Sequence, residues 1–331
     1  MGVHIIAEAG VNHNGDVNLA KQLCFAAKQA GADAVKFQTW VTEKIITQNV
    51  KQADYQVANT GNDQSQFDML KALELTYEET RTVKEYCDSI GIQFASTADE
   101  RDSLEFLLEL GIPYIKIGSG DIGNVSYLRY IGSKGMPVIL STGMSNLSDV
   151  ELSLNALRAG GATDITLLHC TTNYPCPYEN VNLKAMDTLK NAFQLPVGYS
   201  DHTVGIEIPV AAVARGAKVI EKHFTLDRKM DGPDHLASTE PDEFKRMVDA
   251  IRNVEMALGS GVKEPTAAEK EISKVVLKRI VAKQPIPKGK IIEETDITVK
   301  RNETGLPAHA WDYLVGTKAR KDYMEDEGIE F

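Results

Sequence analysis

Short runs of apolar, β-favouring residues recur along the first three-quarters of the chain. Segments with apolar residues at helical spacing separate most of these runs, and glycines end several of the segments. Eight alternating strand–helix units predict an α/β fold, a closed (β/α)8 TIM barrel of parallel strands. The eight predicted strands are His4–Ala7, Ala34–Phe37, Gln93–Ser96, Tyr114–Ile117, Pro137–Ser141, Ile165–His169, Val197–Ser200 and Lys218–Glu221.

Two stretches depart from this rhythm. A polar insertion from Thr42 to Leu75 predicts a long loop with a short helix, and loops of that size tend to be functional. After Leu258 the barrel pattern stops, so we expect a barrel domain over residues 1–258 and a linker with a helical part over 259–278. The remaining residues, 279–331, predict a small, mainly β domain with strands at Ile280–Lys283, Ile291–Ile292 and Ile297–Lys300.

Composition narrows the class of protein. The 331 residues are 43% hydrophobic and 25% charged, as in soluble globular proteins, and no apolar run approaches the ~18 residues of a membrane span. The net charge of −11 argues against a nucleic-acid partner, which would require a concentrated basic surface. The N-terminus lacks the features of a signal peptide and the four cysteines form no disulfide framework, so we expect a cytoplasmic protein.

The predicted strand ends carry polar residues, and two lysines among them are informative. Lys36 and Lys116 each lie between two apolar residues of a predicted strand. An unpaired buried ammonium group is costly, so we expect both lysines to meet an anion at the barrel mouth. Hydroxyl groups at neighbouring strand ends would complete a cradle for phosphate or carboxylate, although such residues also begin ordinary βα loops. They include Thr97, Ser119, Ser141 and Ser200.

Two histidines and two cysteines also lie near strand ends. His202 and His223 follow the seventh and eighth predicted strands, so they should be neighbours at the barrel rim. Two interpretations stay open: a divalent metal site with free coordination positions, or two hydrogen-bonded barrel histidines. We interpret Cys170 and Cys176 as structural, because His169 should point to the opposite face of its strand and cannot serve as their base.

The motifs at these strand ends resemble those of one enzyme family in content and order. They are Glu8–Gly15, Val35–Thr39, Lys116–Gly120, Leu140–Met144, His169–Thr171, Tyr199–Thr203, Glu221–Thr225 and Gly232–His235. Together they resemble the bacterial sialic acid synthases, including N-acetylneuraminate and legionaminate synthases. The tail resembles their antifreeze-like (SAF) domain at Ile280–Lys283, Ile286–Gly289 and Val299–Arg301, so that the resemblance spans essentially the whole chain.

This resemblance implies a reaction and a set of roles. Enzymes of the family condense phosphoenolpyruvate with an N-acetylated mannose-type sugar and release phosphate. By resemblance, His202 and His223 hold a divalent metal, Mn²⁺ or else Mg²⁺ or Co²⁺, and act in catalysis with Glu8. The implied phosphoenolpyruvate contacts are Lys36, Thr97, Lys116, Ser119, Ser141 and Ser200. The implied sugar contacts are Gln38, Asn62, Tyr174, Asp234 and Arg301, the arginine being supplied by the partner's SAF domain in a homodimer that exchanges these domains across its two-fold axis.

Three positions depart from the family pattern, and several functional alternatives stay open. Ala98 and Asn302 stand where the family usually has proline, and Thr172 stands where some members have asparagine. The sugar is either N-acetylmannosamine or the diacetamido-trideoxy sugar that leads to legionaminate, while Gly232–His235 argues against the pseudaminate branch. Outside the family, the rivals are a synthase acting on phosphorylated aldoses, a Schiff-base aldolase using Lys116, and a non-enzymatic sugar-binding barrel.

Overall fold

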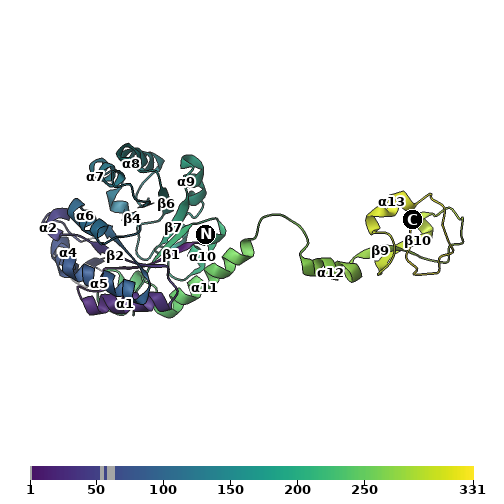
Figure 1. The fold of residues 1–331 in the computed structure, drawn as a ribbon, viewed down its shortest axis with the longest axis horizontal. Helices are drawn as coiled ribbons and strands as arrows, with labels where there is room; N and C mark the ends of the chain where they lie inside the picture. The colour runs from purple at the N-terminus through teal and green to yellow at the C-terminus, as the bar shows by residue number, and fades with distance from the viewer. Residues whose placement is uncertain (1, 53–55, 58–63) are drawn as a thin grey trace. The chain divides into compact units, whose positions relative to one another are not determined.

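The computed structural model describes residues 2–52, 56–57 and 64–331. The chain divides into two compact units, one ending at Gly259 and one running from Ser260 to Phe331 (Figure 1). The expected linker, 259–278, falls within the second unit apart from its first residue, Gly259. No helix in the described part of the chain is long and apolar enough to cross a membrane.

The first unit is a closed barrel of parallel strands surrounded by helices, which confirms the predicted fold (Figure 1). Within the described residues, β1 pairs with both β2 and β8 and so closes the ring. The strands are β1 (His4–Gly10), β2 (Ala34–Thr39), β3 (Gln93–Ala98), β4 (Ile115–Ile117), β5 (Val138–Ser141), β6 (Ile165–His169), β7 (Val197–Asp201) and β8 (Val219–His223). The helices are α1 (Val17–Gln29), α2 (Thr42–Ile45), α4 (Gln66–Leu73), α5 (Tyr77–Ile90), α6 (Arg101–Glu109), α7 (Val125–Gly132), α8 (Leu147–Gly160), α9 (Ala185–Phe193), α10 (Glu207–Ala214) and α11 (Pro241–Leu258).

The barrel interior is built in layers, because successive side chains of a strand point to opposite faces. One layer is mostly apolar and comprises Ile6, Ala34, Ala95, Tyr114, Ile139, Leu168 and Val219. Two residues further along the same strands, at their carboxyl ends, the inward positions hold Glu8, Lys36, Thr97, Lys116, Ser141, Cys170 and Glu221. The alternation that fills the barrel therefore also assembles a polar ring above the apolar layer.

Several strands extend further than the apolar runs indicated. β1 continues to Gly10, β2 to Thr39 and β8 to His223. Polar residues end the apolar runs but not the hydrogen-bonded ladders, so Glu8 and His223 lie within strands, opposite each other in the register of β1 and β8. The insertion contains helices α2 and α4, where we expected one short helix. Met69 and Leu73 of α4 pack against Trp40.

The second unit is small and has its own apolar core around Ile280, Ile292 and Tyr323. It begins with helix α12 (Ala267–Val276), followed by the antiparallel pair β9 (Lys278–Ala282) and β10 (Ile297–Arg301), with the single-turn helix α13 (Trp311–Leu314) near its end. The predicted strand at Ile291–Ile292 is wrong. Ile291 forms an isolated bridge with Lys318, and Ile292 is buried in the core.

Candidate active site at the carboxyl ends of the barrel strands

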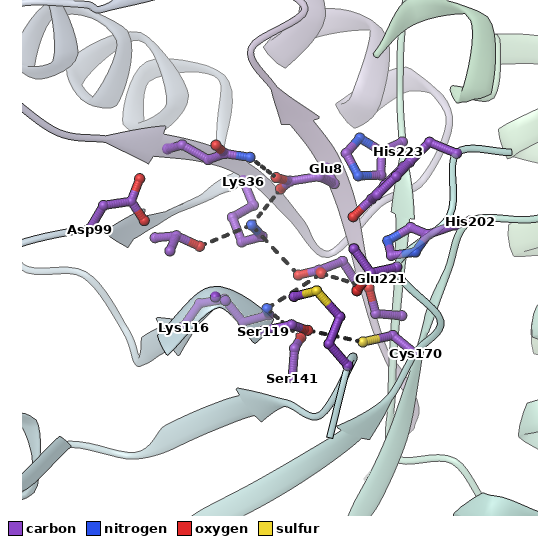
Figure 2. Close-up of a pocket in the computed structure, with 18 residues that line it drawn as sticks. Glu8, Lys36, Asp99, Lys116, Ser119, Ser141, Cys170, His202, Glu221 and His223 are labelled. Carbon is purple, nitrogen blue, oxygen red and sulfur yellow. Dashed lines mark hydrogen bonds and ion pairs between the residues drawn. The ribbon is translucent and has the colours of Figure 1, made fainter. Parts of the chain in front are cut away.

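A polar cavity of about 190 Å³ opens at the carboxyl ends of the strands (Figure 2). The structure brings together at this cavity most of the site residues predicted from sequence. They are Glu8, Lys36, Gln38, Thr97, Lys116, Ser119, Ser141, Tyr174, Ser200, His202 and His223. Residues from distant parts of the chain thus converge where barrel enzymes carry their chemistry.

Both lysines are buried and both contact Glu221. Lys36 Nζ lies 2.7 Å from Glu8 Oε2 and donates to Thr97 Oγ1 at 3.1 Å. Lys116 Nζ donates to Ser141 Oγ at 2.7 Å. The Glu221 carboxylate lies between the two ammonium groups, 3.7 Å from Lys36 and 3.5 Å from Lys116. Two cations therefore share a single central carboxylate, with Glu8 beside one of them (Figure 2).

The two carboxyl groups differ in protonation because their surroundings differ. Burial raises the pKa of Glu8 to about 7, with Lys36 acting in the opposite direction. Burial alone would raise the pKa of Glu221 as well, but Lys116 and Lys36 outweigh it and lower that pKa to about 2. Near neutral pH Glu221 is therefore ionised between the two lysines, while the Glu8 carboxyl exchanges its proton.

Ser119 is packed closely against Gly143 and Cys170. The Gly143 amide donates to Ser119 Oγ at 3.0 Å, and Cys170 Sγ lies 3.3 Å from the same oxygen. A Cβ at Gly143 would lie 2.8 Å from Ser119 Oγ and 2.4 Å from Thr172 Oγ1, so no larger residue fits without displacement. The prediction that both cysteines are structural fits Cys176, which is in the core, whereas Cys170 lines the cavity.

The two histidines are neighbours, as predicted, with ring centroids 5.5 Å apart. His202 Nδ1 lies 2.6 Å from the Thr171 carbonyl oxygen, so this nitrogen carries the hydrogen and Nε2 keeps a free lone pair. Burial lowers the pKa of His202 and of His223, and for His223 the nearby His202 adds to the effect. His223 Nδ1 is buried without a hydrogen-bond partner among the described residues.

These observations fit a divalent metal held by His202 and His223. The lowered pKa values favour the neutral form of both imidazoles, which is the form that binds metal. In His202 the Thr171 carbonyl fixes the ring through Nδ1, and in His223 Nδ1 has no hydrogen-bond partner among the described residues. Within the described residues no third histidine, cysteine or carboxylate completes a closed set of ligands. The donor set is therefore that of an open site, in which substrate and water would fill the remaining positions.

Two described residues predicted for the site are not among those that line the cavity, and a third lies outside the described residues. Asp234 is next to it, with Oδ2 3.9 Å from His223 Nδ1. Arg301 is exposed at the end of β10 in the second unit, opposite Lys278. Asn62 lies outside the described residues.

Among the cavity residues missing from the predicted site, two are acidic, Glu221 and Asp99. Glu221 could have been found from sequence, because it is the inward residue two positions before His223 on the same strand. Asp99 lines the cavity directly after β3, where burial and the nearby Asp121 raise its pKa to about 7. Ala98 ends β3 as a buried strand residue, so its departure from proline leaves the strand intact.

Comparison with known proteins identifies the family of the chain. Residues 23–263 match the NeuB family and residues 279–330 match the SAF domain. The chain belongs to the NeuB family. The N,N'-diacetyllegionaminic acid synthase of Campylobacter jejuni is 49% identical over 98% of this chain and 98% of its own length. The enzyme of the same name from Legionella pneumophila is 47% identical over 96% of this chain and 90% of its own length.

A solved NeuB-type structure agrees with the fold. The N-acetylneuraminic acid synthetase of Leptospira borgpetersenii, crystallised with citrate, superposes with a TM-score of 0.72 at 36% identity. The match covers 82% of this chain and 90% of that one. The family resemblance inferred from the strand-end motifs is thereby confirmed for both the barrel and the SAF domain.

Proposed function

We propose that this NeuB-family protein is a synthase that condenses phosphoenolpyruvate with an N-acetylated mannose-type sugar and releases phosphate. The observation that carries the proposal is the pair of buried lysines, Lys36 and Lys116, which share Glu221 in a small cavity next to two neutral histidines. Phosphoenolpyruvate brings a phosphate and a carboxylate, and two ammonium groups surrounded by hydroxyls suit such a ligand.

The side chains divide the work between binding and proton transfer. Carbon 3 of phosphoenolpyruvate would attack the sugar aldehyde, water would add at carbon 2, and phosphate would leave with cleavage of its bond to that carbon. Lys36 and Lys116 bind the anionic groups and hold them in place as this charge redistributes. The Glu8 carboxyl exchanges its proton near neutral pH and can give it to the aldehyde oxygen as the carbon–carbon bond forms. A divalent cation on His202 and His223 would supply Lewis-acid polarisation of that aldehyde.

The relatives favour the diacetamido-trideoxy sugar over N-acetylmannosamine. The two bacterial enzymes at 49% and 47% identity are both N,N'-diacetyllegionaminic acid synthases, whereas the neuraminic acid synthetase structure is 36% identical. Phosphate release should be measured with phosphoenolpyruvate and each sugar side by side. We expect the higher kcat/KM with the diacetamido sugar, and release with neither sugar would contradict the proposed activity.

A Schiff-base aldolase is the rival that one observation favours. Burial lowers the pKa of Lys116, which is also what a nucleophilic lysine requires. The Lys116 ammonium is nevertheless occupied by Ser141 and Glu221, as expected for anion binding. Borohydride added during turnover should leave the protein mass unchanged, and a covalent adduct on Lys116 would establish the rival mechanism.

We further propose a homodimer in which the SAF domain of one subunit supplies Arg301 to the partner's barrel. Support comes from the SAF match at residues 279–330 and from the exposed position of Arg301 at the end of β10. Arg301→Ala and His202→Ala chains, each inactive alone, should regain partial activity when mixed, because one barrel of a mixed dimer has both groups. A monomer in solution, or no recovery after demonstrated subunit exchange, would exclude this arrangement.

A further inference from the structure

Two sequence motifs lie close to the site: Asn12–Gly15, which follows β1, and Gly232–His235, which carries Asp234 in the segment after β8. We propose that Asn12 and Asn14 are positioning residues that hold the segment 224–238 in place, so that Asp234 is fixed beside His223. The inference rests on the proposed function and on the sugar contact that the family resemblance implies for Asp234.

Asn12 secures the two ends of this segment. It is 1% exposed, and its Nδ2 donates to the Phe224 carbonyl oxygen at 2.9 Å and to Ser238 Oγ at 2.8 Å. Ser238 Oγ in turn donates to the Asp234 carbonyl oxygen at 2.6 Å. A single buried amide thus connects the first residue after β8 to the backbone of Asp234.

Asn14 secures the middle of the segment. Its Nδ2 donates to the Asp231 carbonyl oxygen at 2.8 Å, and its Oδ1 lies 3.3 Å from His235 Nε2. The other ring nitrogen of His235 is 2.6 Å from Thr225 Oγ1, and His235 is fully buried. Residues on both sides of Asp234 are therefore hydrogen-bonded to Asn12 or Asn14 in the loop after β1.

Gly232 shows how closely the two loops approach. Its φ is +151°, and a Cβ there would lie 2.6 Å from His235 Cδ2 and 2.9 Å from Asn14 Oδ1. A side chain at this position would separate the loops or distort the backbone. The two motifs thus form one interlocked unit rather than two independent turns.

The Asp234 side chain itself lacks such anchoring. Its carboxylate accepts no hydrogen bond from the described residues, and the nearest cationic or imidazole nitrogen is His223 Nδ1 at 3.9 Å. Its place at the site is set by its backbone, which the asparagines hold through Ser238, Asp231 and His235. A positioned carboxylate with free lone pairs is suited to accept hydrogen bonds from sugar hydroxyl or amide groups.

The test compares Asn14→Ala with Asn14→Asp in the full-length enzyme. Asn14→Ala loses both contacts, so we expect the sugar KM to rise roughly tenfold, the effect of about one lost hydrogen bond, with the phosphoenolpyruvate KM unchanged. Asn14→Asp keeps the acceptor for His235 and should show a smaller rise. In an Asp234→Ala background, Asn14→Ala should add little, because its effect runs through Asp234.

Asn124→Ala is the matched control. Asn124 caps α7 through Tyr127 N and bonds to Asp121, away from the segment 224–238. It should lower stability slightly and leave the sugar KM unchanged. Hydrogen exchange gives a readout that needs no turnover: amides of residues 225–238 should exchange faster in Asn14→Ala and not in Asn124→Ala.

Two results would overturn the inference. One is an equal rise of both KM values in Asn14→Ala; the other is unchanged exchange over residues 225–238. A wild-type enzyme inert toward phosphoenolpyruvate and either sugar would instead contradict the proposed function. In that case hydrogen exchange would still decide whether the two asparagines hold the segment, and the assignment of Asp234 to the sugar would fall.

Discussion

The two ends of the barrel differ in how their charged side chains are paired. At the amino ends of the strands, Arg252 donates to Asp33 Oδ2 at 2.7 Å, to Glu255 Oε2 at 2.9 Å and to the Val3 carbonyl oxygen at 2.8 Å. Asp33 Oδ2 also accepts from the Ile5 amide at 2.8 Å. Each charged group there meets several partners from the chain itself, so this end is complete without a ligand.

At the carboxyl ends of the strands, several buried polar groups lack a full set of hydrogen-bond or ion-pair partners. Glu221 Oε2 and His223 Nδ1 are buried without hydrogen-bond partners among the described residues, and two ammonium groups share Glu221. Such an arrangement adds little to folding, because desolvation offsets the attraction within buried ion pairs. The comparison suggests that the amino end serves stability and the carboxyl end serves binding, a division that substitutions at each end can test.

The largest expected effect is loss of turnover from His202→Ala or His223→Ala. Either change removes one of the two neutral imidazoles that would hold a divalent cation. Circular dichroism should show an unchanged fold, while phosphate release falls to background. Chelation of the wild type should have the same effect, and added Mn²⁺, or else Mg²⁺ or Co²⁺, should reverse it. Full activity after exhaustive chelation would contradict the metal assignment.

Lys116→Met should separate binding from stability at the carboxyl end. It removes a charge-assisted contact to phosphoenolpyruvate, worth about 1.5–3 kcal/mol, so the KM for this substrate should rise about 10- to 100-fold with a smaller change for the sugar. The free energy of unfolding should change little, because Glu221 keeps Lys36 as its counter-ion when Lys116 is replaced. An effect confined to the sugar would assign Lys116 to the other half of the site.

Lys222→Met is the matched control for that variant. Lys222 is also buried in β8, but its ammonium donates to Asp201 Oδ2 at 2.5 Å and to the Thr203 carbonyl oxygen at 2.8 Å. Its removal leaves Asp201 buried without its cation. We therefore expect Lys222→Met to lower the melting temperature clearly, which Lys116→Met should not do.

The barrel and most of the site could be predicted from the sequence, because both follow from the alternation of inward and outward residues along the strands. Lys36 and Lys116 stood out as charged residues inside apolar runs, and strand alternation brings such residues to one ring. The strand ends were predicted too short, because polar residues such as Glu8 and His223 interrupt the apolar pattern without interrupting the ladder.

Features that depend on contacts between distant segments were not predictable in this way. Asp99 reads as an ordinary polar residue after a strand, and only the fold shows that it lines the cavity. The bonds from Asn12 to Phe224 and Ser238 join residues more than 200 positions apart. Pattern and propensity are local, so they give no information about such pairings.

Arg252→Leu should give the reverse of the Lys116 result at the amino end. It removes the donor shared by Asp33, Glu255 and Val3, at a partly exposed position. We expect the free energy of unfolding to fall by about 1–3 kcal/mol, with kcat and both KM values within twofold of the wild type. Chemical denaturation with parallel kinetics checks this, and a change in either KM without a loss of stability would break the division between the two ends.

The smallest expected effect is a pH-dependent one at the amino end, where His4 Nε2 lies 3.1 Å from the Tyr114 hydroxyl. Burial lowers the pKa of His4, with Arg252 acting in the same direction and Asp33 in the opposite one. The pKa of His4 is lower in the folded chain than its unfolded value of about 6.5. As the pH falls below that value, His4 is protonated in the unfolded chain but stays neutral in the folded chain, which favours unfolding. His4 therefore costs stability in acid and is neutral in its effect above pH 7. At pH 8, His4→Phe should be less stable than the wild type, because the hydrogen bond to Tyr114 is missing. Between pH 7 and 5 this difference in stability should become smaller, because only the wild type pays the cost of keeping His4 neutral. Melting temperatures of both proteins across this range decide the matter: a difference that stays constant with pH would show that His4 titrates alike in the folded and unfolded chains.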